Sequence, residues 1–513
     1  MLLGQEAGAS DNRFLNGSIS NLLNTNLDSR YIQDALGDAA SKNVFSTGGK
    51  SAMLSYFGKV DYNLNDRYVL SGTLRRDGSS RLGPNNRWGT FPAFGLGWRI
   101  SNEPFLNNNR IFSDVMLRYG WGVTGNQSIP EGRIVSQFGG SRGDTYYDVT
   151  GSNSTVAAGF RSVSLGNPDL KWEENRSSNV GADMLLFDGR VNIVLDLYRR
   201  TTNNLLFDPQ TPATAGIAAP PIVNVGKMKN TGIDFSIGTQ GRMGTITLTG
   251  SRYKNEIVSI DGVQDFFYGP IATRFGNQII NKVGHPIGSF YGLVADGFFN
   301  SDAEVTAHAT QDGAAPGRIR FKDVNGDGKV TLDDRTVIGS PHPDFTAGLD
   351  LGTRRGRFDL SATLFGTFGN DIFDVQKEFY IFRNFSTNVR DDLLANSWTP
   401  TNTGAKYPRI DENDSYSHAL SSFYVEDGSY VRLRNVRLGY DVPQSIASWL
   451  SRTNVYVQAE NLFTFTGYDG LDPALPAANV FGPAGDIRDQ YRGVDRGTYP
   501  SSRTFSIGIS TTF

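Results

Sequence analysis

Apolar and polar residues alternate along much of this chain, most clearly in its last segment. In residues 505–513 one face carries apolar residues and threonine, namely Phe505, Ile507, Ile509, Thr511 and Phe513, and serine, glycine and threonine occupy the other. Because the side chains of a β-strand alternate between two faces, this pattern predicts a strand with one apolar face.

The same alternation recurs upstream, at residues 56–64, 68–75, 115–123, 191–198, 233–237 and 345–351. Some of these segments hold a charged residue in mid-strand: Arg118, Asp196, Asp234 and Asp350. A mid-strand charge is costly in a dry core but is typical of the wet interior of a membrane barrel. The pattern alone leaves open a soluble antiparallel β protein with one solvated face.

The connections favour the membrane barrel. Short turns rich in glycine and charge, at 187–190, 241–244 and 354–356, strictly alternate with long polar segments at 124–177, 200–230, 254–343, 368–429 and 462–502. Loops this long are rare in compact soluble domains, whereas outer-membrane barrels have short periplasmic turns and long extracellular loops. We predict an all-β fold, an antiparallel transmembrane β-barrel of about fourteen strands that begins at residues 2–8 and ends on the periplasmic side.

Composition excludes several other functions. The net charge of −3, without a block of Lys or Arg, indicates no nucleic-acid partner. The absence of cysteine excludes disulfides and thiol chemistry. Mean hydropathy is −0.34 and no apolar run is long enough for a membrane helix. The four histidines stand in no metal or catalytic motif, so we expect no enzyme.

Residues 1–30 contain no basic segment followed by an apolar run, which is the pattern of an export signal. An exported barrel needs such a signal. We therefore expect the natural start of the protein to lie upstream of Met1.

An acidic segment at residues 323–334 matches the spacing of an EF-hand-type calcium loop. Oxygen-bearing side chains stand at its first, third, fifth and twelfth positions, with glycine at the sixth. The predicted ligands of one structural Ca²⁺ are Asp323, Asn325, Asp327, the backbone carbonyl of Lys329, and Asp334. The alternative is an Asp- and Gly-rich turn without a metal.

The long loops also carry aromatic clusters, at residues 146–147, 266–268, 379–382 and 423–424. Exposed aromatic rings stack on sugars or peptide side chains, or pack against a partner protein. The alternative is that these rings only fold the loops onto one another. The sequence leaves both uses open.

Short motifs spread over nearly the whole chain resemble the SusC/RagA family of TonB-dependent outer-membrane transporters. In the order of that family they are RRDGSS at 75–80, NRWGTFP at 86–92, WRIS at 98–101, GNQ at 125–127, NPDLKWE at 167–173, VGKMKN at 225–230, SFYG at 289–292, DVNGDG at 323–328, PDF at 343–345, YVRLR at 430–434 and AENLF at 459–463. The resemblance implies residence in the outer membrane of a Gram-negative cell.

The resemblance also implies a larger protein. Family members have a signal peptide, a small β-sandwich domain, a TonB-contacting segment and a plug before a barrel of about 22 strands. Residues 1–513 then correspond to the C-terminal part of the barrel, with residues 254–343 as a long extracellular loop, and the chain is expected to be a fragment or part of a split protein.

The function that the resemblance implies is import of oligosaccharides or peptides. The implied partners are a SusD-like surface lipoprotein that covers the barrel, TonB through the missing N-terminal parts, and membrane lipid. Two alternatives remain open: a passive porin or structural barrel, and a calcium-stabilised surface-binding β protein.

Overall fold

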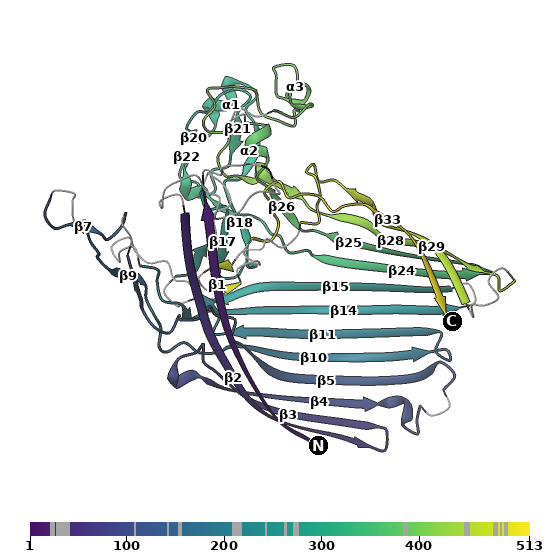
Figure 1. The fold of residues 1–513 in the computed structure, drawn as a ribbon. Helices are drawn as coiled ribbons and strands as arrows, with labels where there is room; N and C mark the ends of the chain where they lie inside the picture. Colours follow the sequence, from purple (N-terminus) through teal and green to yellow (C-terminus); the bar gives the residue numbers. More distant parts are fainter. Residues whose placement is uncertain are drawn as a thin grey trace.

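One large antiparallel sheet dominates the protein in a computed structural model (Figure 1). The structure describes residues 1–20, 26, 42–106, 109–140, 143–151, 156–207, 218–241, 244–260, 264–269, 276–382, 388–445, 452–475, 481–482, 485–486 and 491–512. The fourteen strands of the sheet follow one another in chain order: β1 (Leu2–Ile19), β2 (Lys42–Leu64), β3 (Tyr68–Ser79), β4 (Trp88–Arg99), β5 (Phe112–Asn126), β10 (Glu173–Leu186), β11 (Val191–Asn203), β14 (Lys227–Gly241), β15 (Gly244–Ser259), β24 (Phe345–Arg355), β25 (Phe358–Phe368), β28 (Tyr430–Val442), β29 (Arg452–Thr466) and β33 (Thr504–Thr512). The predicted fold class and strand number are confirmed.

The first strand is longer than the predicted 2–8. It continues to Ile19, and every residue from Leu2 onward has a partner in β2. Residues 9–19 are too polar to show clean alternation, so only pairing with β2 reveals them as strand. At the other end β33 stops at Thr512, and Phe513 lies outside the described residues.

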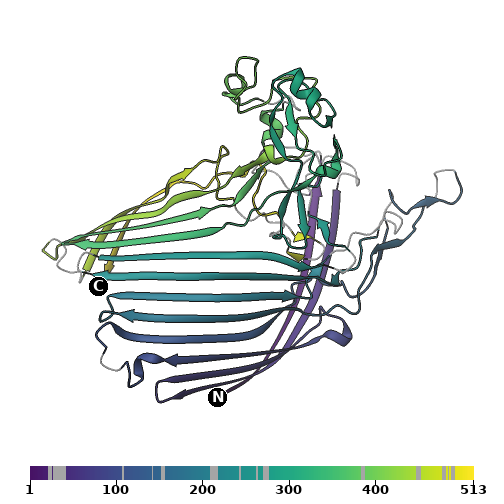
Figure 2. The same ribbon diagram turned by 180° about the vertical axis from the view of Figure 1, so that it is seen from behind.

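The short connections lie at one edge of the sheet, and both chain ends lie at the same edge (Figures 1 and 2). Two of these turns have left-handed backbone at both central residues: Asn65 and Asp66 have φ of 54° and 52°, and Asp188 and Gly189 have φ of 56° and 83°. That geometry is the type I′ hairpin turn, which matches the twist of the two strands it joins. Residues 242–243 of a third turn lie outside the described residues.

The long connections leave the opposite edge, as predicted, but their alternation with short turns is not strict. The β3–β4 connection, residues 80–87, lies at the long-loop edge and is short. It is closed by the Ser79 N to Arg87 O hydrogen bond (3.0 Å) and a single 3₁₀ turn at Pro84–Asn86. The connection after β15 begins at residue 260 rather than 254, because β15 runs on to Ser259.

The two faces of the sheet differ in polarity. The register places Arg118, Asp196 and Asp234 on one face, where the guanidinium of Arg118 donates to Asp183 (2.6 and 2.8 Å) and to Asp196 (3.3 Å). Asp350 lies on the same face and accepts from Thr363 (2.7 Å). The other face exposes apolar side chains, among them Leu117, Val180, Leu197, Ile246, Leu438, Val457 and Ile507. The polar and apolar strand faces predicted from the alternation are therefore confirmed.

The long connections carry small sheets and short helices. Their strands are β6 (Gln137–Gly139), β7 (Tyr147–Asp148), β8 (Val156–Ala157), β9 (Arg161–Ser164), β12 (Leu206–Phe207), β13 (Val223–Asn224), β16 (Phe266–Tyr268), β17 (Ile279–Lys282), β18 (Ser289–Gly292), β19 (Ala295–Phe298), β20 (Thr310–Gln311), β21 (Ile319–Phe321), β22 (Lys329–Val330), β23 (Thr336–Gly339), β26 (Asp371–Asp374), β27 (Val425–Asp427), β30 (Phe481–Gly482), β31 (Gly485–Asp486) and β32 (Val494–Asp495). The α-helices are α1 (Asp302–Ala307), α2 (Lys377–Tyr380) and α3 (Leu393–Asn396). No helix in the described ranges has the length and apolar character needed to cross a membrane.

Candidate functional site: the loop assembly at one edge of the sheet

Three long connections fold together above the long-loop edge of the sheet (Figure 1). Their shared core contains Ile279 and Phe290 from the first, Phe373 and Tyr424 from the second, and Val494 from the third. The rings of Phe373 and Tyr424 stack with centroids 5.5 Å apart, and Phe290 meets Phe373 edge-on at 5.7 Å. We call this folded body, built from the described residues within 260–344, 369–429 and 467–503, the loop assembly.

Several of the predicted aromatic clusters form the interior of the loop assembly. Phe382 packs against Phe423 and Tyr424, with ring centroids 5.6 and 6.0 Å apart. Tyr424 is buried, and its hydroxyl donates to the carbonyl oxygen of His418 (3.0 Å). For Tyr424 the packing alternative is correct, because a buried ring cannot stack on a ligand.

A different group of apolar residues remains exposed, on the connection between β5 and β10. This connection, residues 127–172, leaves the sheet as a separate arm that carries β6 to β9 (Figures 1 and 2). Its base is held by a core that includes Ile129, Leu170 and Trp172. Six apolar residues along the arm are more than half exposed, namely Val135, Phe138, Tyr147, Val149, Val156 and Phe160, and Phe138 and Phe160 are 72% and 78% exposed. Of the aromatic residues noted in the sequence, Tyr147 belongs to this surface.

A buried polar cluster in the loop assembly was not found from the sequence. Asp374, at the end of β26, accepts a hydrogen bond from the hydroxyl of Tyr380. Lys377 forms an ion pair with Glu426 (2.7 Å) and donates to the carbonyl oxygen of Phe423 (2.7 Å). Burial raises the pKa of Asp374 to about 6, against the opposing effects of Tyr380 and Lys377. Asp374, Lys377 and Tyr380 lie within seven residues of one another, but Glu426 comes from a distant part of the same long connection, so local spacing could not have revealed the whole cluster.

This cluster connects to the third loop. β26 pairs in parallel with β32, and the hydroxyl of Tyr468 donates to Asp495 of β32 (2.7 Å). Asp374 and Asp495 are both almost fully buried. Hydrogen-bonded carboxylates in such surroundings hold loops together, and we assign this cluster a structural role.

The predicted calcium loop is a hydrogen-bonded turn in the first loop of the assembly. Asp323 accepts from the backbone N–H groups of Gly326 (2.7 Å) and Gly328 (2.8 Å). Asn325 and Asp327 each accept, at 2.9 Å, from the N–H group two residues further on. Lys329 lies in β22, which pairs with β20. Both carboxylate oxygens of Asp323, and one side-chain oxygen each of Asn325 and Asp327, therefore already accept hydrogen bonds from the backbone of the turn.

The last predicted ligand, Asp334, is fully buried and closes this turn. Its carboxylate accepts from the N–H groups of Val324 (2.8 Å), Asn325 (3.2 Å) and Thr331 (2.7 Å). Burial alone would raise the pKa of Asp334, but these N–H groups hold it below its usual value. In the described part of the chain no three His, Cys, Asp or Glu side chains gather closely enough to hold a metal ion. Calcium binding stays a prediction.

The architecture, one wide sheet with a polar face, an apolar face and loops at one edge, has known counterparts. Residues 3–462 match the family model described as TonB dependent receptor-like, beta-barrel. The chain belongs to the TonB-dependent receptor family. TonB-dependent receptor P3 of Formosa agariphila is 32% identical over 493 residues, 93% of this chain and 47% of that protein. TonB-dependent receptor SusC of Bacteroides thetaiotaomicron is 28% identical over 503 residues, 93% of this chain and 45% of that protein.

Among solved structures, the RagAB peptide transporter superposes with a TM-score of 0.78 at 24% identity, over 100% of this chain and 53% of that one. This likeness concerns the fold. Together these matches identify a receptor of the SusC/RagA type, located in the outer membrane, and they exclude the soluble alternative. The chain spans about half the length of the curated relatives it matches. The polar face of the receptor lines the lumen, the apolar face meets lipid, and the short turns are periplasmic.

Proposed function

We propose that this receptor chain supplies the wall and external loops of a nutrient importer of the SusC/RagA type. The family match over residues 3–462 carries this proposal, together with the fourteen-strand wall. Import would be driven through TonB, whose contacts belong to parts of the complete receptor outside this chain. The cargo would be an oligosaccharide or a peptide; the RagAB relative is a peptide transporter by its own description.

The inner face supports passage of a polar solute. Arg118, Asp183 and Asp196 meet there, and Asp234 bonds to Ser251 (2.6 Å) on the same face. Paired charges and hydroxyl groups on a wetted wall can exchange hydrogen bonds with hydroxyl or amide groups of a passing cargo. Since no nucleophile with an adjacent base was found in the sequence, transport suits this wall better than chemistry.

The partner would be a SusD-like surface lipoprotein that covers the loops. The β6–β9 arm supports this part of the proposal, since it exposes six apolar side chains on the external side of the receptor. A surface of this kind is typical of a protein–protein contact. The aromatic core of the loop assembly, which includes Phe290, Phe373 and Tyr424, is buried, and this favours the arm as the docking surface.

Uptake by whole cells tests the proposal. Deletion of the complete gene should abolish growth on one class of oligosaccharide or peptide as sole carbon source, and a protonophore should stop uptake in the wild type. Uptake that continues with a protonophore, or in a strain without TonB, would favour the passive porin, which needs no energy source.

We also propose that residues 323–334 bind one structural Ca²⁺. The proposal rests on the oxygen spacing, and on a turn that already holds Asp323, Asn325 and Asp327 together. The oxygens that bond to N–H groups retain a second lone pair, so these bonds do not prevent coordination. The ion would offset repulsion among the carboxylates and stiffen the loop.

A further inference from the structure

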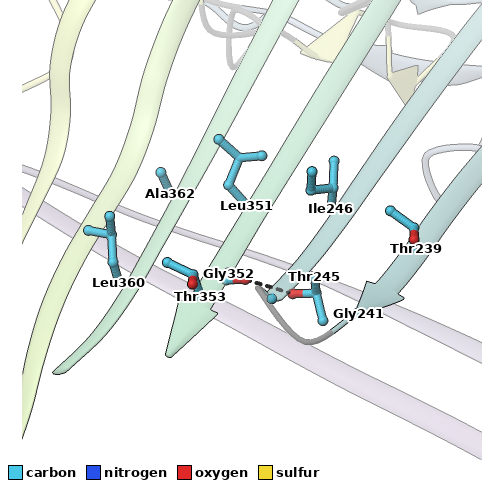
Figure 3. Close-up of a pocket in the computed structure, with 10 residues that line it drawn as sticks. Thr239, Gly241, Thr245, Ile246, Leu351, Gly352, Thr353, Leu360 and Ala362 are labelled. Carbon is cyan, nitrogen blue, oxygen red and sulfur yellow. Dashed lines mark hydrogen bonds between the residues drawn. The ribbon is translucent and has the colours of Figure 1, made fainter. Parts of the chain in front are cut away.

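A hollow of about 550 Å³ opens on the wall near its periplasmic edge, across β14, β15, β24 and β25 (Figure 3). Ile246, Leu351, Leu360 and Ala362 line it, along with threonine and glycine residues. The hollow is separate from the loop assembly, which stands at the other edge of the sheet. Cargo passage, docking of the lipoprotein and calcium binding do not involve this hollow.

The strand register shows which face this hollow occupies. Ile246 is paired with Leu351, and Leu351 with Ala362, so the three side chains lie on one face. Asp350, next to Leu351, points to the lumen with Thr363. Because neighbouring residues of a strand face opposite ways, the hollow lies on the lipid-facing side.

Small residues make the hollow, and branched residues form its walls. Gly241 and Gly244 both occupy outward positions, and a Cβ atom on Gly241 would meet no atom within 4 Å. Ala362 is a third small residue. The larger side chains of Ile246 and Leu360 line the sides of the hollow and are 49% and 43% exposed. An apolar hollow on the lipid side of a membrane wall is filled by hydrocarbon, since water is excluded there.

Arg355 lies at the periplasmic end of the hollow. Along β24 the outward positions are Leu351, Thr353 and Arg355, and the register pairs Arg355 with Phe358. Phe358 packs against Tyr440 with ring centroids 5.0 Å apart. An aromatic pair on the lipid face near the strand ends marks the headgroup level of the bilayer.

The charge of Arg355 is available at that level. Its neighbour Arg354 points the other way and forms an ion pair with Asp441. Arg355 is exposed, and among the described residues the structure shows no ion pair for it. A guanidinium beside an apolar hollow, at headgroup height, matches a phosphate that carries an acyl chain.

We propose that this hollow binds one anionic phospholipid of the periplasmic leaflet. One acyl chain lies along Ile246, Leu351 and Leu360, and the phosphate contacts Arg355. The proposal rests on the outer-membrane location of the receptor and not on its proposed transport function. Charge complementarity and continuity with the lipid-facing wall select a lipid over a protein as the occupant.

Native mass spectrometry of the complete receptor, delipidated in detergent, tests the proposal. Dioleoylphosphatidylglycerol, dioleoylphosphatidylcholine and inorganic phosphate would each be titrated. We expect one phosphatidylglycerol molecule to remain bound at collision energies that remove phosphatidylcholine, and inorganic phosphate alone not to bind. Equal retention of the two lipids would overturn the proposal, because the headgroup charge would then play no part.

Two variants locate the site. Arg355→Gln should weaken phosphatidylglycerol binding about fivefold, the effect expected for one arginine near a lipid surface. Ala362→Phe should fill the hollow and reduce binding by at least about tenfold, through loss of the acyl-chain contact. Wild-type retention in either variant would overturn the proposal.

Matched controls use the same substitutions elsewhere on the lipid face. Arg199→Gln changes an exposed outward arginine at the external end of β11, and Ala182→Phe enlarges an outward alanine of β10. Both should bind phosphatidylglycerol like the wild type. If they lose binding to the same extent as the test variants, the lipid is held by the belt in general and the proposed site is wrong. Heat-modifiable gel migration confirms that each variant has folded.

Discussion

Arg432 of β28 and Asp472 of the third loop form an ion pair that is almost closed to solvent, with side chains 7% and 8% exposed. Asp472 also accepts from the backbone N–H groups of Ala474 (2.8 Å) and Ser501 (2.9 Å). Burial by itself would raise the pKa of Asp472, but Arg432 and these N–H groups lower it below its usual value. The pair fixes the loop before β33 to the wall.

Asp472→Ala should therefore loosen the third loop. Removing one partner of a buried pair leaves an uncompensated charge, at a cost of about 3–5 kcal/mol. Hydrogen–deuterium exchange of residues 491–503 should rise strongly, with the strands of the wall unchanged. The control is Asp469→Ala in the same loop, whose ion pair with Lys406 is more exposed and should contribute less than about 1 kcal/mol. Equal exchange in the two variants would contradict the assigned role of Asp472.

The raised pKa of Asp374 predicts that the loop assembly becomes less stable as pH rises. Its folded pKa of about 6 lies above the ordinary 3.8, so the folded loop assembly binds this proton more tightly than the unfolded chain. The associated stability, about 3 kcal/mol, is fully present below the ordinary pKa and is lost as pH rises through about 6. Glu426, Lys377 and Tyr380 are the charged and titratable groups that act on it.

Asp374→Asn removes this titration and isolates its effect from that of other carboxylates. Exchange protection of the loop assembly, compared between pH 7 and pH 5 after correction for intrinsic rates, should rise on acidification in the wild type relative to the variant. Asp472 and Asp411, whose pKa values are lowered, act in the other direction and are common to both proteins. A difference between the proteins that does not change with pH would show that Asp374 is not protonated in this range.

Calcium binding can be tested by the protease sensitivity of the loop that contains residues 323–334. Asp327→Ala should abolish protection of this loop from protease by Ca²⁺, because the variant lacks a predicted ligand. Asp333→Ala is the matched control, since Asp333 is exposed and is not a predicted ligand. Limited proteolysis with Ca²⁺ and with a chelator reads the result. Identical cleavage of the wild type in both conditions would leave a turn that needs no metal.

The β6–β9 arm predicts the contact with the lipoprotein. Phe138→Asp together with Phe160→Asp should reduce co-purification of a SusD-like partner by about tenfold or more, because each change places a charge in an apolar contact. Phe105→Asp is the control: Phe105 is 71% exposed, but it lies in the β4–β5 connection at the periplasmic edge. Normal co-purification of the double variant would show that the partner docks elsewhere.

The strands of the receptor wall were predictable from the amino-acid sequence. Alternation in segments such as 191–198 and 345–351 gives each strand its lipid and lumen faces, because the strand period is a local property. The short turns at 187–190 and 354–356 were equally predictable from local residues. The order of motifs then gave the family. The prediction of the first strand missed residues 9–19, because their strand structure depends on pairing with β2.

The roles of the loop residues depend instead on how the loops fold together. The tertiary structure buried Phe373 and Tyr424 and left Phe138 and Phe160 exposed, although all four are aromatic residues in long polar segments. It also paired Asp374 with Asp495 and brought Lys377 beside Glu426, and it placed Arg355 at the end of an apolar hollow formed by four strands. Such neighbours are set by how distant segments pack, and packing between distant segments leaves no period or spacing in the sequence.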